Sequence, residues 1–302
     1  MFRVMDSHAH SAAGPSPSRT ALMSAAARAA HLLVDQQPPI FADTVAAALL
    51  GERAEELLGY HHAFGSHPIL AGARTTAVTR SRCAEERLAE AVARRGIDQY
   101  VVLGAGLDSF ACRSELVDSI RVFEVDHPHT QEWKQARLAA AGITVPPTVS
   151  FVPLDLEQAG ARALTAALAA AGFDPARPAV VSWLGVTMYL SVEAIGQVLS
   201  TIGEFAPGTE LIAEHLLPAE HRDPAGQAYA EQVQAAAAEG GEPWRTFLAV
   251  EEMDTLLSAH GLRPLASLRQ RDTVDAELWN ERADALRPFE LSVLAHAVVP
   301  ER

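Results

Sequence analysis

Residues 100–126 have the sequence YVVLGAGLDSFACRSELVDSIRVFEVD, and this stretch decides the fold. The runs at 100–103 and 121–125 are short, apolar and rich in β-branched residues. Such runs are typical of strands that are buried on both faces of a sheet. We therefore predict two neighbouring strands with a crossover between them.

The residues between the two strands predict a tight turn that leads into a helix. The turn comprises Gly104, Ala105 and Gly106. Glycine allows the backbone to adopt a positive φ or to approach a ligand closely. Asp108 or Ser109 is expected to cap the helix that follows. A strand, a glycine turn, a helix and a second strand form a βαβ unit, which is typical of nucleotide-binding sheets.

Asp126 ends the second strand, 20 residues after Gly106. Its two carboxylate oxygens can accept hydrogen bonds from both hydroxyls of a ribose. The dinucleotide fingerprint has a third glycine where this chain has Ser109. The negative charge of Asp108 also disfavours a pyrophosphate at this helix. The stretch therefore favours S-adenosylmethionine (SAM), a cationic nucleoside, over a dinucleotide, and a merely structural turn stays open as an alternative.

Four motifs in order extend this interpretation along the chain. They are LGAGLDSFACR at 103–113, VFEVDHPHTQEWKQARL at 122–138, PLDLE at 153–157 and SWLGVTMYL at 182–190. By these motifs the chain resembles the leucine carboxyl methyltransferase-like family of class I SAM-dependent methyltransferases, and more closely its bacterial O-methyltransferase branch. The motifs are specific for the family and not for a substrate.

The resemblance implies a Rossmann-like α/β fold with a seven-stranded, mostly parallel sheet flanked by helices. In that fold the final strand is antiparallel. The alternation of elements alone supports only a mostly parallel sheet that is covered on both faces. A last helix is predicted at 277–286 and a last strand at 291–299.

We expect three parts along the chain. Residues 1–17 are predicted to be a flexible tail, residues 18–96 a helical cap, and residues 97–302 the SAM-binding domain. An insertion at about 218–245 is expected to lie over the active site, with a loop at 243–247 bordering the acceptor pocket. The division into a cap and a Rossmann-like domain is what the resemblance implies.

Within the cap, helices are predicted at 20–34, 45–50 and 52–58. The segment 60–68, YHHAFGSHP, is predicted to be a surface linker. Its three histidines allow a metal site or a general base as alternatives to simple packing. A further helix is predicted to begin at Thr79 and to lead into the glycine turn.

The resemblance also implies which residues hold the cofactor. These are Arg80, Gly104, Ala105, Gly106, Asp126, His127, Asp155, Leu156 and Leu184. Arg80 is expected to pair with the methionine carboxylate of SAM, although Arg80 and Arg82 could both simply face water. Asp126 is expected to bind the ribose. Several relatives have a glutamate at the position of Leu184, and in the carboxyl methyltransferases that glutamate contacts the cofactor.

The adenine is expected to lie between Asp155 and Leu156. The carboxylate would accept a hydrogen bond from the exocyclic amine, and the leucine would pack on the ring. An acid directly after a strand is also typical of an ordinary helix cap, which stays open as the alternative.

Methyl transfer is an in-line displacement that depends mainly on positioning the acceptor oxygen. A carboxylate acceptor needs no base, whereas a phenol or an alcohol usually does. We name His215 and Tyr189 as the catalytic candidates, with Glu214 and His61 as further possible bases. The Glu214-His215 pair could equally be a hydrogen-bonded polar pair beneath a loop.

Composition limits the function further. The 302 residues carry a formal net charge of −14, which argues against nucleic acid or an anionic membrane as the main partner. No apolar run approaches the length of a membrane span, and the two cysteines form no CxxC pair. We expect a cytoplasmic protein without a metal site; a pairing of His8 with His10 is the weak alternative.

The expected function is O-methylation of a small molecule, on a carboxylate or a hydroxyl, in secondary metabolism. Two alternatives remain open at this stage. One is a non-catalytic SAM-binding protein, and the other is a lyase or oxidoreductase on the same type of sheet. The sequence does not specify the acceptor or the oligomeric state.

Overall fold

Seven strands form one sheet in the computed structural model, which describes residues 18–301. The strands are β1 (Gln99–Leu103), β2 (Arg121–Asp126), β3 (Val149–Pro153), β4 (Val180–Trp183), β5 (Glu210–Leu216), β6 (Arg263–Arg269) and β7 (Ser292–Val298). Their order in the sheet is β3-β2-β1-β4-β5-β7-β6. Only the two pairings of β7 are antiparallel. The predicted fold class is therefore confirmed.

Helices cover both faces of the sheet, which explains why β1 is buried along its whole length. One face carries α7 (Ala161–Ala170), α8 (Val192–Gly203) and α10 (Val250–Ala259). The other face carries α4 (Pro68–Arg95) and α5 (Phe110–Arg113). Successive side chains of β1 point to opposite faces of the sheet, as in any pleated strand. Val101 and Leu103 pack toward α7 and α8, whereas Tyr100 and Val102 pack toward α4.

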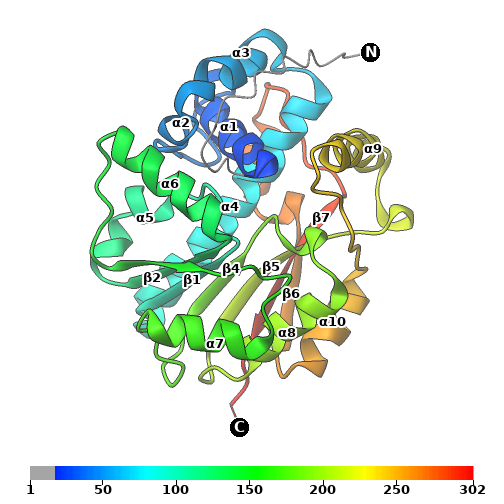
Figure 1. Ribbon diagram of the computed structural model, residues 1–302. Helices are drawn as coiled ribbons and strands as arrows, with labels where there is room; N and C mark the ends of the chain where they lie inside the picture. Colours follow the sequence, from blue (N-terminus) through cyan, green and yellow to red (C-terminus); the bar gives the residue numbers. More distant parts are fainter. Residues whose placement is uncertain (1–17, 302) are drawn as a thin grey trace.

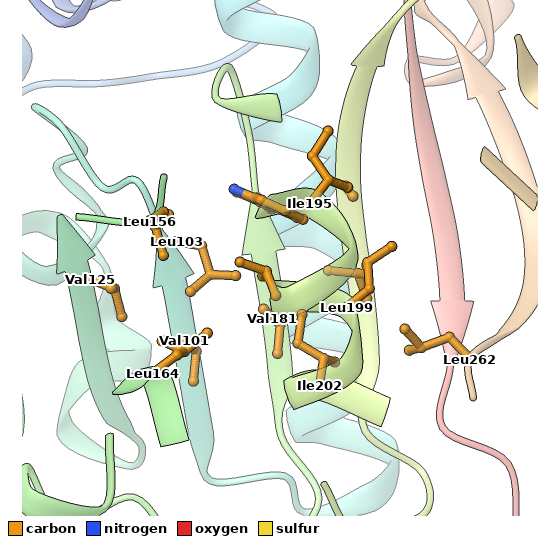
Figure 2. Packing of buried hydrophobic residues seen from close by; sticks show 14 of the residues in the cluster. Val101, Leu103, Val125, Leu156, Leu164, Val181, Ile195, Leu199, Ile202 and Leu262 are labelled. Carbon is orange, nitrogen blue, oxygen red and sulfur yellow. The ribbon is translucent and has the colours of Figure 1, made fainter. Parts of the chain in front are cut away.

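Figure 2 shows the first of these two layers. Aliphatic side chains from three parallel strands meet those of α7 and α8 in one continuous cluster. The labelled members are Val101, Leu103, Val125, Leu156, Leu164, Val181, Ile195, Leu199, Ile202 and Leu262. Burial of this set stabilises the packing of α7 and α8 on the sheet.

A group of helices lies above the carboxyl ends of the parallel strands (Figure 1). It comprises α1 (Arg19–Val34), α2 (Ala46–Leu49), α3 (Ala54–Phe64), α6 (Pro128–Ala140) and the first turns of α4. Helix α9 (Pro224–Glu239) stands beside them and contacts α4. The second half of α4 packs on the sheet through Ala84 and Leu88. Because α4 belongs to both layers, the domain division at residue 96 remains a prediction.

Two predictions about the cap are wrong. Tyr60 to Phe64 continue α3 and do not form a linker. The next helix begins at Pro68, with His67 as its N-cap, and runs unbroken for 28 residues. The predicted helix start at Thr79 is wrong, because that residue lies in the middle of α4. The true start follows from proline at the first helical position, where its missing N–H costs nothing.

The predicted helix at 277–286 is also wrong in extent. Helix α11 (Ala276–Asn280) ends early. Just beyond it the guanidinium of Arg282 is bound by Asp284 and donates to the backbone oxygen of Gln36. These long-range contacts with the cap replace further helical turns.

Among residues 18–301, no helix combines the length and apolar character needed to cross a membrane. The predicted tail at 1–17, with His8 and His10, lies outside the described residues. Burial raises the pKa of both cysteine thiols, Cys83 and Cys112, to about 11. Both are therefore protonated and unreactive at neutral pH.

Candidate active site

A cavity of about 1330 Å³ lies between the carboxyl ends of the strands, the cap helices and α9. It is at the point where β1 and β4 are neighbours and the strand order reverses, which is where open α/β sheets bind ligands. All nine residues expected to hold the cofactor line it. Tyr189, Glu214 and His61 line it as well, whereas His215 does not.

The glycine turn leaves β1 with a backbone that other residues rarely adopt. Gly104 and Gly106 have φ values of +64° and +51°. A Cβ atom at Gly104 would also overlap a methyl group of Val186. Helix α1 fixes the turn from above, because Arg28 donates a hydrogen bond of 2.6 Å to the backbone oxygen of Leu107. The cap and the turn therefore form one rigid wall of the cavity.

The carboxylate of Asp126 is held at the end of β2 by two backbone donors. One oxygen accepts from the N–H of Gly106, and the other accepts from the N–H of His127 at 2.6 Å. Each oxygen keeps a second lone pair for a ligand hydroxyl. Burial raises the pKa of the Asp126 carboxyl, while these two donors oppose the shift. The arrangement fits a vicinal diol such as that of a ribose.

Asp155 and Leu156 follow β3 at the same edge of the sheet. One oxygen of Asp155 accepts from the N–H of Glu157 at 2.9 Å, so this carboxylate does cap the following turn. The other oxygen has no hydrogen-bond partner among residues 18–301. Leu156 is buried in the core and borders the cavity with one side. His127 is the N-cap of α6, where its Nδ1 accepts from the N–H of His129 at 3.3 Å.

Arg80 projects from the middle of α4 into the cavity. Its Nη1 atom lies 2.7 Å from Oε2 of Glu214, and its Nη2 atom donates to Ser24 at 3.0 Å. Gly185 has a φ of +71°, and a Cβ there would lie 2.6 Å from the guanidinium. Arg82, by contrast, pairs with Glu86 and does not line the cavity. Of the two arginines, only Arg80 is available to a ligand.

Glu214 lies near the end of β5 and is completely buried, whereas the Arg80 side chain is 17% exposed. Its Oε2 atom is paired with Arg80, but its Oε1 atom has no hydrogen-bond partner among residues 18–301. Glu214 and Leu216 both line the cavity because they lie two residues apart on one strand. The sequence signal for these two lining residues was the alternation of side chains along a strand, which puts every second residue on the same face.

Because side chains alternate along a strand, His215 faces away from the cavity. This corrects the expectation that His215 acts on the acceptor. Its Nδ1–H donates to the backbone oxygen of Leu248 at 3.0 Å. Its Nε2 atom is buried without a partner in the described structure. Burial lowers the pKa of this imidazole to about 4. His215 is therefore a neutral residue beneath the sheet.

His61 lines the cavity but cannot take a proton from a ligand. Arg74 donates to its Nδ1 atom at 3.1 Å, and a guanidinium can only donate. The ring proton must then lie on Nε2. Burial, and next the charge of Arg74, lower the pKa of His61 to about 4. The surface loop predicted here is wrong, because His61 is only 5% exposed and belongs to α3.

Tyrosines from two elements face the same part of the cavity. Tyr189 ends the short 3-10 helix η3 (Thr187–Tyr189), and its hydroxyl accepts from Trp244 Nε1 at 3.4 Å. Tyr229 comes from α9 and packs on Phe289. Burial raises the pKa of both phenols, so they are neutral donors and poor bases at neutral pH. Sequence reasoning missed Tyr229, because nothing local indicates which side of α9 faces inward.

The sequence model of the family described as "Leucine carboxyl methyltransferase" matches residues 21–203, which is more than half of the chain. The chain is 30% identical over 302 residues to the "Putative S-adenosyl-L-methionine-dependent methyltransferase YktD" of Bacillus subtilis, covering 93% of this chain and 97% of that protein. A protein of the same description from Mycobacterium marinum is 34% identical over 211 residues, covering 65% of this chain and 64% of the relative.

Two solved structures share the fold. One is a "putative methyltransferase" from Thermobifida fusca, with a TM-score of 0.59, 18% identity, and coverage of 95% of this chain and 96% of that one. The other is a DUF574 family protein from Streptomyces avermitilis, with a TM-score of 0.56, 17% identity, and coverage of 91% and 97%. At these identities the likeness shows the fold alone.

Proposed function

Since the chain belongs to the leucine carboxyl methyltransferase family and is a SAM-dependent methyltransferase, we propose that it methylates an oxygen atom of a small molecule. The observation that carries this proposal is the continuity of one cavity. The cavity reaches from the glycine turn and Asp126 to a part beside α9 that is lined by Tyr189, Tyr229 and Trp244. A cofactor and an acceptor can therefore lie in contact within it.

The residues at the β1, β2 and β3 end of the cavity fit SAM. Asp126 offers two lone pairs to the ribose hydroxyls, and Asp155 with Leu156 offers an acceptor and an apolar surface to the adenine. Arg80 has five N–H groups, of which two are used by Glu214 and Ser24, so it retains donors for a carboxylate. When bound, SAM supplies an electrophilic methyl group on a sulfonium.

The volume of the cavity leaves room for a second molecule. About 1330 Å³ exceeds the range of about 300–1,000 Å³ that is usual for a single drug-sized ligand. The remaining wall includes a large apolar and aromatic surface. This surface is formed by Met188, Tyr189, Leu216, Tyr229, Val233, Trp244 and Leu291, and polar residues such as Gln232, Glu242 and Arg245 also line the wall. Such a wall suits a small organic acceptor better than a highly charged polymer, as does the net charge of −14.

The chain needs no nucleophile of its own for this reaction. Its task is to hold the acceptor oxygen against the methyl group and to keep water out, and positioning of this kind lowers the barrier greatly. Helix α9 and the cap helices cover the cavity at the carboxyl ends of the strands. Tyr189 and Tyr229 are placed to donate hydrogen bonds to the acceptor.

The test is calorimetric titration of the protein and of Asp126→Ala with SAM, S-adenosylhomocysteine and NAD. Binding of the two SAM compounds, and its loss in the variant, supports the cofactor site. Release of S-adenosylhomocysteine with a panel of carboxylic acids, phenols and alcohols then tests O-methylation. Tight SAM binding without turnover on any acceptor would favour a non-catalytic role, and binding of NAD alone would refute the proposal.

A further inference from the structure

The unpartnered oxygen of Glu214 points to a ligand group that the chain itself does not supply. The side chain is completely buried, and the residue is part of the cavity lining. Oε2 is paired with Arg80 at 2.7 Å, while Oε1 has no donor in the described structure. A buried carboxylate oxygen without a donor is costly, and native proteins keep few of them. A ligand that donates a hydrogen bond to Oε1 would remove this cost.

The place of Glu214 in the sheet indicates which ligand donates. Asp126 ends β2, and β5 lies three strands further along the sheet. At about 4.8 Å for each step, the two strand ends are about 14 Å apart. Leu216 of the same strand and Tyr229 of α9 line the same cavity as Glu214. Glu214 and its partner Arg80 therefore lie far from the ribose site, at the point where the cofactor and acceptor parts of the cavity meet.

A second, independent feature describes the body of the acceptor. Six large hydrophobic residues are exposed in the described part of the chain, and three of them line this cavity. They are Met23 of α1 and Tyr60 and Phe64 of α3, with exposed fractions of 41%, 53% and 51%. Clusters of exposed apolar side chains at a cavity are typical of ligand-binding grooves. The cavity therefore opens through an apolar rim.

We propose that the acceptor is an apolar molecule with a hydroxyl group, that this hydroxyl donates to Glu214 Oε1, and that the apolar body lies against the rim formed by Met23, Tyr60 and Phe64. This inference rests on the proposed function and narrows it from oxygen in general to a hydroxyl. An ionised carboxylate has no proton to donate, and it would bring a second negative charge to Glu214.

Glu214 then acts directly on the acceptor. Oε1 takes the hydroxyl proton as the acceptor oxygen forms its bond to the methyl carbon, and it later releases the proton to water. The electron pair of the broken carbon–sulfur bond remains on sulfur, so the products are a methyl ether and S-adenosylhomocysteine. The other candidates are unsuited, since His61 has no free lone pair, His215 faces away, and Tyr189 is a neutral phenol.

The experiment compares 2-naphthol with 2-naphthoic acid, which share one apolar body. Calorimetry with the protein saturated in S-adenosylhomocysteine is expected to show binding of the naphthol and weaker binding of the acid. Phe64→Ser is expected to weaken naphthol binding about five- to tenfold, because it removes apolar contact area. Leu33→Ser is the matched control, since Leu33 is 52% exposed but does not line the cavity, and it should change nothing.

Glu214→Gln tests the proton acceptor. It is expected to bind naphthol and SAM within about threefold of the parent protein and to lower kcat for naphthol methylation at least about a hundredfold. Thermal unfolding of the variant establishes that it is folded. Weakened SAM binding with unchanged kcat would instead assign Glu214 to the ammonium group of the cofactor.

Other outcomes also test the assignment of a hydroxyl acceptor. Preferred binding and methylation of the naphthoic acid would overturn the hydroxyl assignment, and so would the absence of naphthol binding in the saturated protein. Neither result would touch the proposed O-methylation. Failure to bind SAM at all would end both proposals, and the calorimetric titration with SAM alone reveals that case separately.

Discussion

Replacing Arg80 with methionine should destabilise the protein far more than removal of an ordinary ion pair. Glu214 is completely buried, and Arg80 is its only hydrogen-bonding partner on either side-chain oxygen in the described structure. The variant Arg80→Met leaves that carboxylate without any partner. Removing one member of a buried pair typically costs about 3–5 kcal/mol, because an uncompensated charge stays in the interior.

We therefore expect Arg80→Met to lower the free energy of unfolding by about 3–4 kcal/mol at pH 7.

Urea unfolding at pH 7 measures this loss. Arg94→Met is the matched control on the same helix, because Arg94 lies 2.7 Å from Glu90 but is 77% exposed. Its loss should cost at most about 1 kcal/mol. The double variant Arg80→Met with Glu214→Leu should recover most of the stability, since an apolar pair can replace a buried ion pair. Equal losses for Arg80→Met and Arg94→Met would refute the reasoning.

Three further outcomes are expected. Gly104→Ala should cost about 1–3 kcal/mol more in urea unfolding than Gly96→Ala, because φ is +64° and +65° but only the first Cβ meets another side chain; equal costs would contradict the clash. Asp126→Asn should weaken SAM binding about ten- to hundredfold by calorimetry, and binding by the parent protein should weaken as the pH falls, because burial raises the pKa of the Asp126 carboxyl; unchanged affinity would place the ribose elsewhere. The folded protein holds His215 at a pKa of about 4, against 6.5 when unfolded. The unfolded chain binds this proton first, so up to about 3 kcal/mol of stability is lost from pH 6.5 to 4. For His215→Asn, the free energy of unfolding should fall less between pH 7 and pH 4.5 than it does for the parent protein. An equal fall in the two proteins would mean that another group titrates.

The sequence was sufficient for those features that depend on local signals. A β-branched run, two glycines and an acid at a fixed distance predict β1, the turn and the end of β2, and the structure confirms these elements. Seven strands followed from the same patterns together with the resemblance. All nine predicted cofactor residues line one cavity because each lies at or just beyond the end of a strand, or on the helix that covers those ends. Their contacts with SAM remain predictions.

The failures at His61 and His215 have a common physical origin in contacts that the local sequence does not show. His61 was expected in a surface loop, but it is buried because Arg74, 13 residues later, donates to its ring. His215 was favoured over Glu214 for its chemistry, although a shift of one residue on a strand moves a side chain to the opposite face. Whether a given strand position faces the cavity depends on register and on the helices that cover each face.

The ion pair between Arg80 and Glu214 is better explained by function than by stability. An apolar pair of similar volume at the contact of α4 with β5 would stabilise the fold as well or better, because it avoids the loss of hydration of two charges. The pair also leaves Glu214 Oε1 without a donor, which adds to its cost. Arg80 still has free N–H groups, and Glu214 has an oxygen without a donor, and both residues line the cavity. A pair with unused capacity on both members is suited to hold two ligands, with the cofactor carboxylate on the guanidinium and the acceptor hydroxyl on the carboxylate.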